Sequence, residues 1–365
     1  MIKIRIAKGL ANLRMAALPA LSLAILLSLA GCAQHAGFPG RGGASAPDAT
    51  RAGAPLPPQT STPAAGEPPA AAPLPKAAAV PPPVPVPLPS PPAEPLSIPP
   101  RIGLALGGGA ARGFAHVGVI MVLEQAGILP EFIAGTSAGA VVGAIYAAGY
   151  RSADLQRIAG QLAEADVRDF VLPDRGFLGG DRLQSFINRA VQDRPIEKLN
   201  IRFAAVATDL QSGEGVVFRR GDTGLSVRAS SAVPGVFRPT IVGDRRMVDG
   251  GLTHPIPVRA ARALGAELVI AVDISSQPQF ARLGDSIDIL LQTFTIMGRA
   301  LGATELAEAD VVIRPAVGQL RATDFQSRKL AIAEGQRAAR EALPEIRRRI
   351  EAATRRISPP AGAPR

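Results

Sequence analysis

The chain has 365 residues, enough for one large domain or two small ones, and its composition includes 38 Gly, 35 Pro and no Trp. Its net charge of +10 comes with only 4% aromatic residues and without a zinc-finger, RNA-recognition or basic-zipper pattern, so nucleic acid is not an expected partner. An anionic membrane surface is the better match for that charge. One cysteine excludes an intrachain disulfide, and with three histidines it cannot form an ordinary closed zinc site, so no metal is expected.

Residues 1–31 have the pattern of an export signal. Basic residues in the first 14 positions precede an apolar stretch, 16–30, that is too short for a comfortable membrane span. The stretch ends in Leu-Ala-Gly-Cys32, which resembles the lipobox of bacterial lipoproteins, where the cysteine becomes the lipidated first residue of the mature chain. Cys32 is thus expected to anchor the protein in a membrane. Ala33 follows, which by analogy favours the outer membrane, facing the periplasm; an uncleaved anchor with an incidental thiol is the alternative.

Residues 32–100 are dominated by Pro, Ala, Gly and Ser and carry few bulky apolar side chains. Such a segment cannot offset the entropy of ordering itself, so it is expected to be a disordered tether with polyproline II character in its Pro-rich part. A spacer that holds a domain away from a membrane and an inert linker both fit this composition.

A glycine-rich loop, Gly107-Gly-Gly-Ala-Ala-Arg-Gly113, follows an apolar strand expected at 102–106 and precedes a helix that ends near Gly127. Backbone N–H groups converge on an anion in this arrangement. Dinucleotide binding fits poorly, because Ala110 stands where the fingerprint requires glycine and no acidic residue closes the next strand, so no cofactor is expected. The better interpretation is an oxyanion hole, whose donors lie about 3 Å from a developing negative charge.

A second motif, Gly135-Thr-Ser-Ala-Gly139, has the spacing G-x-S-x-G around Ser137. An apolar run, 132–134, leads into it and a helical pattern leads out, as a nucleophile elbow requires. In such an elbow the serine adopts an uncommon backbone conformation, and its neighbours must be small. An ordinary tight turn is the alternative for the motif alone. Because adjacent parallel strands end at one sheet edge, this turn and the glycine loop are expected to lie together.

Asp249 follows an apparent strand at 246–248, and Gly250 and Gly251 let the chain turn away after it. Alone, it would be interpreted as a turn aspartate that caps its own backbone. With Ser137 elsewhere in the chain it gains a second interpretation, because free serine is a poor nucleophile and needs a positioned base.

The segments Gly103–Gly118, Gly135–Gly139 and Asp249–Gly251, in that order, resemble the patatin-like phospholipases. Within that family they look closest to bacterial proteins related to the neuropathy target esterase catalytic domain, and the resemblance covers about residues 101–320. It implies a serine lipid acyl hydrolase, a phospholipase or lysophospholipase that works through an acyl-enzyme. A thioesterase or general carboxylesterase, or a catalytically silent lipid-binding envelope lipoprotein, are the alternatives.

The resemblance also implies the residue roles. Ser137 and Asp249 would form a Ser–Asp dyad, and the expected oxyanion-hole residues are Gly107, Gly108, Gly109, Ala110, Arg112 and Gly113. Many members have glycine at the position of Ala110, and alanine there is expected to be tolerated if its φ is negative. His254 stands where asparagine is more usual.

The two histidines near these motifs offer other roles. His254 allows a Ser–Asp–His triad as an alternative, although a side chain so near Asp249 in the chain would also have to reach Ser137. His116, one helical turn past the glycine loop, is expected to be structural.

Strand-like and helix-like segments alternate, which predicts a three-layer α/β/α sandwich with a mainly parallel central sheet. The expected divisions are a catalytic domain at 101–275, a helical extension packed on it at 276–357 and a disordered tail at 358–365. A helix at 327–353, broken near Pro344, carries basic residues 347–349 beside an apolar face. They would form either the solvated rim of a packed helix or a contact with anionic headgroups.

Overall fold

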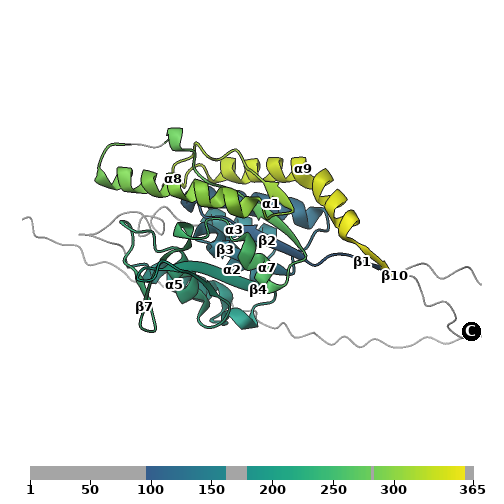
Figure 1. Cartoon of the computed structure of the whole chain (residues 1–365), viewed down its shortest axis with the longest axis horizontal. Coiled ribbons are helices and arrows are strands. Elements are labelled where there is room, and N and C mark those ends of the chain that lie inside the picture. The colour runs from purple at the N-terminus through teal and green to yellow at the C-terminus, as the bar shows by residue number, and fades with distance from the viewer. Residues whose placement is uncertain (1–95, 162–178, 281–282, 358–365) are drawn as a thin grey trace, which may run out of the picture. The chain divides into compact units, whose positions relative to one another are not determined.

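A computed structural model describes residues 96–161, 179–280 and 283–357 (Figure 1). The expected signal peptide, Cys32, the tether up to residue 95 and the tail at 358–365 lie outside these ranges. The expected end of the tether at residue 100 needs correction. Residues 96–98 form strand β1 (Leu96–Ile98), which pairs antiparallel with β10 (Arg355–Ile357). The tether can therefore extend no further than residue 95.

The central sheet has eight strands in the order β6-β7-β4-β3-β2-β8-β9, with β5 paired to β4. The parallel strands are β2 (Ile102–Leu106), β3 (Phe132–Thr136), β4 (Arg202–Asp209), β8 (Leu268–Val272) and β9 (Val311–Ile313). The antiparallel strands are β5 (Gly215–Phe218), β6 (Thr240–Val242) and β7 (Arg245–Asp249). All residues of β2, β3 and β8 are buried, as expected for strands with both faces covered.

The helices are α1 (Phe114–Gln125), α2 (Ala138–Ala147), α3 (Ser152–Gln161), α5 (Asp181–Val191), α6 (Thr223–Ser230), α7 (Val258–Leu264), α8 (Ser286–Leu306) and α9 (Arg328–Ala353). Short 3₁₀ turns are η1 (Ala110–Gly113), η2 (Ile196–Lys198), η3 (Gly250–Leu252) and η4 (Pro278–Phe280). None of the helices in the described ranges has both the length and the hydropathy of a bilayer crossing.

The two larger apolar cores of the described residues lie on opposite faces of the sheet. Leu104 and Leu106 of β2 belong to the larger core, with residues of α1, α2, α3, α5 and α9. Ala105, between them in sequence, belongs to the second core, which includes residues of α7. Because successive strand side chains point to opposite faces, this division confirms the predicted three-layer α/β/α sandwich.

The C-terminal part of the chain differs from the expected helical extension. Strand β9 pairs with β8 and completes the sheet, so a boundary at residue 275 would divide the core. Helix α9 continues through Pro344, where a break was predicted. Proline removes one hydrogen bond from a helix, but Ile346 beyond it is fully buried in the larger core and keeps the following turns in place.

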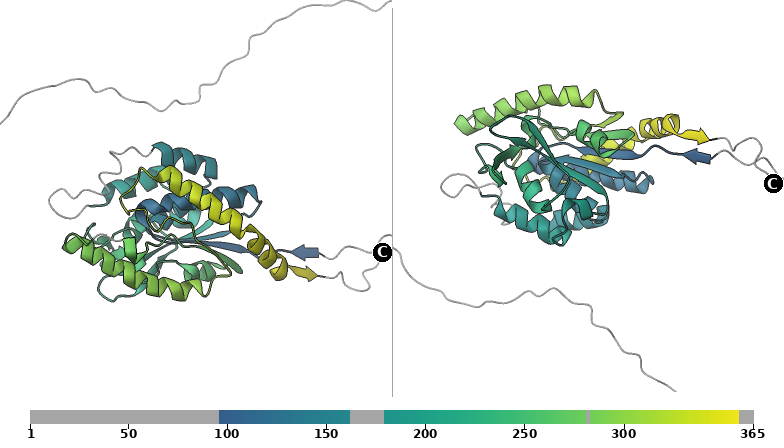
Figure 2. Two further views of the ribbon diagram at one scale, coloured as in Figure 1. Left: turned by 90° about the horizontal axis from the view of Figure 1, so that it is seen from above. Right: turned by 60° about the horizontal axis from the view of Figure 1, so that its bottom comes forward.

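Helices α1 and α9 approach closely at two glycines. A Cβ on Gly118 would lie 2.0 Å from the carbonyl oxygen of Ile332, and one on Gly335 would lie 2.0 Å from that of Ala115. Only glycine permits this backbone contact, which holds α9 over the helix that follows the glycine loop. In Figure 2 the β1–β10 ribbon extends from one end of the domain, while α8 runs along its outside.

Candidate active site

Ser137 lies in a strained turn between β3 and α2, with φ 53° and ψ −119°. Non-glycine residues rarely adopt such angles, which cost about 1–3 kcal/mol and require a surrounding structure that holds them. A Cβ on Gly135 would lie 2.5 Å from the Gly139 oxygen, and one on Gly139 would lie 2.0 Å from the Leu106 oxygen. Ser137 therefore has the uncommon conformation expected of an elbow serine, and both flanking positions have room only for glycine.

A second serine holds this elbow in place. The Ser137 N–H donates to Oγ of Ser230, at 2.9 Å, and the Ser230 hydroxyl donates to the Val206 carbonyl of β4, at 2.5 Å. Ser230 is the last residue of α6 and is fully buried. Sequence reasoning gave Ser230 no role, although residues 229–239 resemble a stretch of the patatin-like phospholipases.

Strand register brings Asp249 to the same place. Thr136 of β3 pairs with Val206 of β4, and the next residue of β4, Ala207, pairs with Asp249 of β7. The elbow serine and the aspartate therefore lie on either side of β4. Gly250 passes so close to β4 that a Cβ there would meet the Val206 oxygen at 2.1 Å, so this position requires glycine.

The two oxygens of the Asp249 carboxylate differ: one accepts a backbone hydrogen bond, and the other has no hydrogen-bond partner of regular geometry among the described residues. Oδ1 accepts the Gly251 N–H at 2.7 Å, so the expected backbone cap exists. Oδ2 is buried and accepts no hydrogen bond of regular geometry from the described residues. Burial raises the pKa of Asp249 to about 6, although the Gly251 N–H and the nearby Ser137 hydroxyl act in the opposite direction. The carboxylate is thus ionised at neutral pH, close to Ser137 and basic enough to accept a proton.

The first two amides of the glycine loop are already used by the scaffold. Gly107 donates to the Val272 carbonyl, at 3.1 Å, and Gly108 donates to the Pro255 carbonyl, at 3.0 Å. These contacts fix the loop to β8 and to the segment after Asp249. They also correct the expectation that Gly107 and Gly108 are oxyanion donors, because a committed N–H cannot also bind a reacting oxygen.

The next two amides, of Gly109 and Ala110, have no acceptor among the described residues. They stand at the start of η1, where helical N–H groups are left unpaired. The Ala110 φ is 49°, so the expected negative value is wrong: this position has the left-handed conformation that favours glycine. Alanine nevertheless keeps the N–H. Gly108 lies beside the serine, since a Cβ there would be 3.4 Å from the Ser137 Cβ.

Arg112 and Gly113 hold the loop and do not act as donors. The Arg112 guanidinium is buried and donates to the carbonyls of Ile274, at 2.9 Å, and Leu320, at 3.0 Å. Burial lowers the pKa of Arg112 to about 10, against the opposing effect of Asp273. A Cβ on Gly113 would lie 2.7 Å from the Cβ of Ala138, so this glycine lets η1 pack against the elbow.

A family model described as patatin-like phospholipase matches residues 104–262, which include all three motifs. The chain contains a patatin-like phospholipase domain. An uncharacterized NTE family protein of Mycobacterium tuberculosis is 40% identical over 179 residues, covering 48% of this chain and 49% of the relative. Patatin-like phospholipase domain-containing protein 6 of Mus musculus is 33% identical over 196 residues, covering 51% and 14%. The chain thus spans about half the length, or less, of these relatives.

Two solved structures resemble the patatin-like domain at low sequence identity. VipD from Legionella pneumophila has a TM-score of 0.47 and 13% identity over 71% of this chain and 68% of that one. Full-length ExoU with SpcU from Pseudomonas aeruginosa has a TM-score of 0.42 and 14% identity over 71% and 54%.

Neither histidine near the patatin-like motifs forms a hydrogen bond to Ser137 or Asp249 in the described ranges. His116 is fully buried, its Nε2 lies 2.9 Å from the Gly107 oxygen, and burial lowers its pKa to about 4, so a neutral ring supports the glycine loop. Nδ1 of His254 lies 3.0 Å from Oε1 of Glu305 on α8. In the described ranges no hydrogen bond joins His254 to Ser137 or Asp249, so the geometry does not favour a triad.

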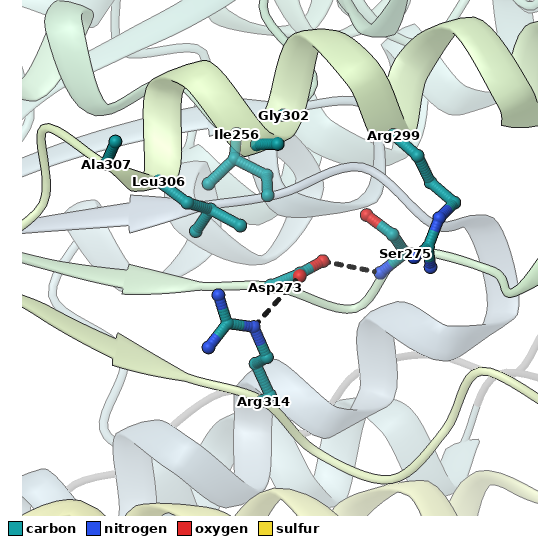
Figure 3. A pocket seen from close by; sticks show the side chains of 9 residues that line it. Ile256, Asp273, Ser275, Arg299, Gly302, Leu306, Ala307 and Arg314 are labelled. Atoms are coloured by element: carbon teal, nitrogen blue, oxygen red, sulfur yellow. Dashed lines mark hydrogen bonds and ion pairs between the residues drawn. The ribbon is translucent and has the colours of Figure 1, made fainter.

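A cavity of about 380 Å³ lies at the carboxyl ends of β8 and β9, under α8 (Figure 3). Its polar wall includes Asp273, which accepts the Ser275 N–H and lies 3.6 Å from Nε of Arg314. The residues that line it do not include Ser137 or Asp249, so this cavity is separate from the candidate dyad. Across the described part of the chain, no three His, Cys, Asp or Glu side chains cluster as a metal site requires.

Proposed function

We propose that the protein is a serine acyl hydrolase that cleaves the acyl esters of phospholipids or lysophospholipids. The observation that carries the proposal is the buried Asp249 carboxylate, with its open Oδ2, beside a serine in a strained elbow. A structural aspartate would have both oxygens satisfied. An open, desolvated carboxylate with a raised pKa is typical of a general base.

Acylation begins when Oγ of Ser137 attacks the ester carbonyl carbon and its proton passes to Oδ2 of Asp249. The carbonyl oxygen becomes negative and accepts hydrogen bonds from the free amides of Gly109 and Ala110, which the scaffold leaves without partners. The bond to the leaving alcohol then breaks, and Asp249 returns the proton to that alcohol. The fatty acyl group stays on Ser137 as an ester.

Deacylation uses the same groups in the reverse order. Asp249 takes a proton from water, the resulting hydroxide attacks the acyl-enzyme carbonyl, and the same two amides bind the new oxyanion. Collapse releases the fatty acid and returns the proton to Ser137. One carboxylate therefore serves both half-reactions, so no histidine is required between it and the serine.

The lipid substrate class rests on the patatin-like domain and on the NTE family relatives. The expected lipid anchor at Cys32, with a position on the outer membrane facing the periplasm, remains part of the proposal. A Cys32→Ser variant is expected to leave the membrane fraction and to change mobility on gels. A variant that keeps both properties would contradict the anchor.

Covalent labelling with a fluorophosphonate probe tests the chemistry. The wild-type chain is expected to label at Ser137, Ser137→Ala not at all, and Asp249→Asn about 10² to 10⁴ times more slowly. His254→Ala is the matched control and should label at nearly the wild-type rate, because its ring bonds to Glu305. A folded wild-type protein that does not label would favour a silent lipid-binding protein.

Turnover separates the esterase classes. Long-chain phospholipid, lysophospholipid, an acyl thioester and a short soluble ester are compared at equal enzyme concentration. A higher kcat/KM for the thioester or the short ester than for both lipids would replace the phospholipase proposal by a thioesterase or general carboxylesterase.

A further inference from the structure

Helix α8 exposes an unusually apolar face. Five large apolar side chains on it are between 38% and 55% exposed: Ile289, Leu290, Ile296, Met297 and Leu301. From Asp288 to Arg299 no charged residue interrupts this stretch. Spacings of four residues (297 to 301) and seven residues (289 to 296 and 290 to 297) place these side chains on one side of the helix. A contiguous patch of this kind marks an interaction surface.

The opposite face of α8 is fixed to the domain by polar contacts. Glu305 is buried and accepts the Ile256 N–H at 3.1 Å while it bonds to His254. Nε2 of Gln292 donates to the Pro278 carbonyl at 3.0 Å. These contacts determine the rotation of the helix, so the apolar side chains cannot turn inward without breaking them.

The other long helix provides a contrast. Helix α9 also has an apolar face, but Ile346 is fully buried and the flanking Ile350 packs against the larger core. Its basic residues Arg348 and Arg349 pair with Glu345. The apolar face of α9 is therefore used within the fold, while the five apolar side chains of α8 keep 38% to 55% of their surface exposed.

Helix α8 lies beside the candidate dyad. A Cβ on Gly298 would lie 3.8 Å from the Gly251 oxygen, two residues after Asp249, and Leu290 lies 3.1 Å from the Cβ position of Gly235. Figure 1 shows α8 on the outside of the domain, and Figure 2 shows the same arrangement from two other directions. A surface that docked on the exposed face would therefore be separated from the segment after Asp249 by the helix itself.

We propose that the exposed face of α8 docks on an anionic phospholipid bilayer. The helix is not apolar enough to cross a membrane, but a helix with one apolar face lies in the interface plane with that face among the acyl chains. Charge supports a lipid occupant. Arg299 on α8 forms no ion pair with any described residue, and Arg314 lies across the cavity from it (Figure 3). Arg314 pairs with Asp273, so the unpaired Arg299 is the charge on α8 that favours anionic headgroups.

Vesicle sedimentation tests the docking surface, with the full chain carrying Cys32→Ser so that no lipid anchor contributes. The chain with an unchanged α8 is expected to bind vesicles of phosphatidylcholine and phosphatidylglycerol more tightly than vesicles of pure phosphatidylcholine. Loss of one buried Ile or Met from the interface corresponds to about a tenfold change in binding, so Ile296→Glu with Met297→Glu should weaken it about 100-fold. Hydrolysis of a short soluble ester and the melting temperature should not change.

A matched double variant, Ile98→Glu with Leu129→Glu, controls for added charge. These side chains are 42% and 49% exposed and precede the amino ends of β2 and β3, at the sheet edge opposite the dyad. It should bind vesicles within about twofold of wild type. Equal loss in both double variants, or no loss in the α8 variant, would overturn the proposal. The proposal would also be overturned if the wild-type chain were a dimer in light scattering and the α8 variant a monomer that still binds vesicles. The apolar face of α8 would then be covered by a second copy of the chain.

The docking inference deepens the proposed function but is measured separately from it. Ser137→Ala should bind vesicles like the wild-type chain while it hydrolyses nothing. A chain that labels and hydrolyses soluble ester but binds no vesicles would refute docking alone. One that binds through α8 but never labels would refute the hydrolase alone.

Discussion

Replacing Asp249 by asparagine is expected to stabilise the protein at neutral pH while it removes the proposed activity. The carboxylate is buried, and its Oδ2 has no regular hydrogen bond from the described residues, so the native state holds a desolvated negative charge. Asparagine has the same shape and keeps an oxygen for the Gly251 N–H. It carries no charge, so that desolvation cost disappears.

The magnitude follows from the pKa of Asp249, which burial raises from 3.8 to about 6. Each tenfold change in proton affinity corresponds to about 1.4 kcal/mol, so ionising the carboxyl at pH 7 costs the native state about 3 kcal/mol. The folded pKa lies above the unfolded one, so the native state binds the proton more tightly. The cost is absent below about pH 4, grows between pH 4 and 6, and is complete above pH 6.

Urea unfolding of both proteins from pH 4 to pH 8 measures this difference. Asp249→Asn should gain up to about 3 kcal/mol at pH 7 and nothing at pH 4. Asp209→Asn is the matched control, because Asp209 also ends a strand but its pKa is lowered, mainly by a hydrogen bond from Arg245. That variant should lose stability at pH 7. Two results would contradict this: Asp249→Asn that is no more stable than wild type at pH 7, or a gain in unfolding free energy that is as large at pH 4 as at pH 7. Either would show that the Asp249 charge is well solvated, and the argument for a base would fail.

Three further outcomes are expected. Because Asp249 must be ionised to accept a proton, kcat/KM for a soluble ester should rise as the pH passes about 6 and then level off, and a flat profile from pH 4.5 to 8 would contradict this. Ala110→Gly should add about 1 kcal/mol to the free energy of unfolding without changing kcat, because the φ of 49° strains alanine; equal or lower stability in urea would argue against the strain. Ser230→Ala should cost about 1–3 kcal/mol and slow fluorophosphonate labelling, since the buried Ser137 N–H loses its acceptor, and an unchanged labelling rate would remove Ser230 from the positioning of the elbow.

The local features of the site could be predicted because each depends on neighbours in the sequence. The strain at Ser137 follows from a buried strand that ends one residue before a helix, with glycines where backbone atoms crowd. The close approach of Gly139 to Leu106 belongs to the same motif. The meeting of the serine turn with the glycine loop follows from the parallel pairing of β2 and β3. Each step uses only short-range sterics and the geometry of a parallel sheet.

The partners that decide which groups are free could not be predicted, because they come from distant parts of the chain. Whether the Gly108 amide is available depends on Pro255, and the Ser137 amide is held by Ser230, 93 residues away. The partner of the His254 ring, Glu305, likewise lies 51 residues further along the chain. The pattern around each residue indicates what it can do, but only the tertiary structure determines which donors and acceptors are already occupied.

Three unfavourable features meet at one edge of the sheet: the strained Ser137, the left-handed Ala110 and the desolvated Asp249. Each destabilises the fold by itself, and an ordinary turn would relax away from all three. Here they cannot relax, because the Ser230 hydroxyl, the Gly107 and Gly108 amides and the Arg112 guanidinium fix the same loops from behind. Each of these scaffold groups has a hydrogen-bond partner, whereas Oδ2 of Asp249 and the amides of Gly109 and Ala110 have none of regular geometry among the described residues. A crowded turn shaped only by stability would have bonded that oxygen and those two amides as well. The division is therefore what the proposed hydrolase needs, since its base and its oxyanion donors have to be left available.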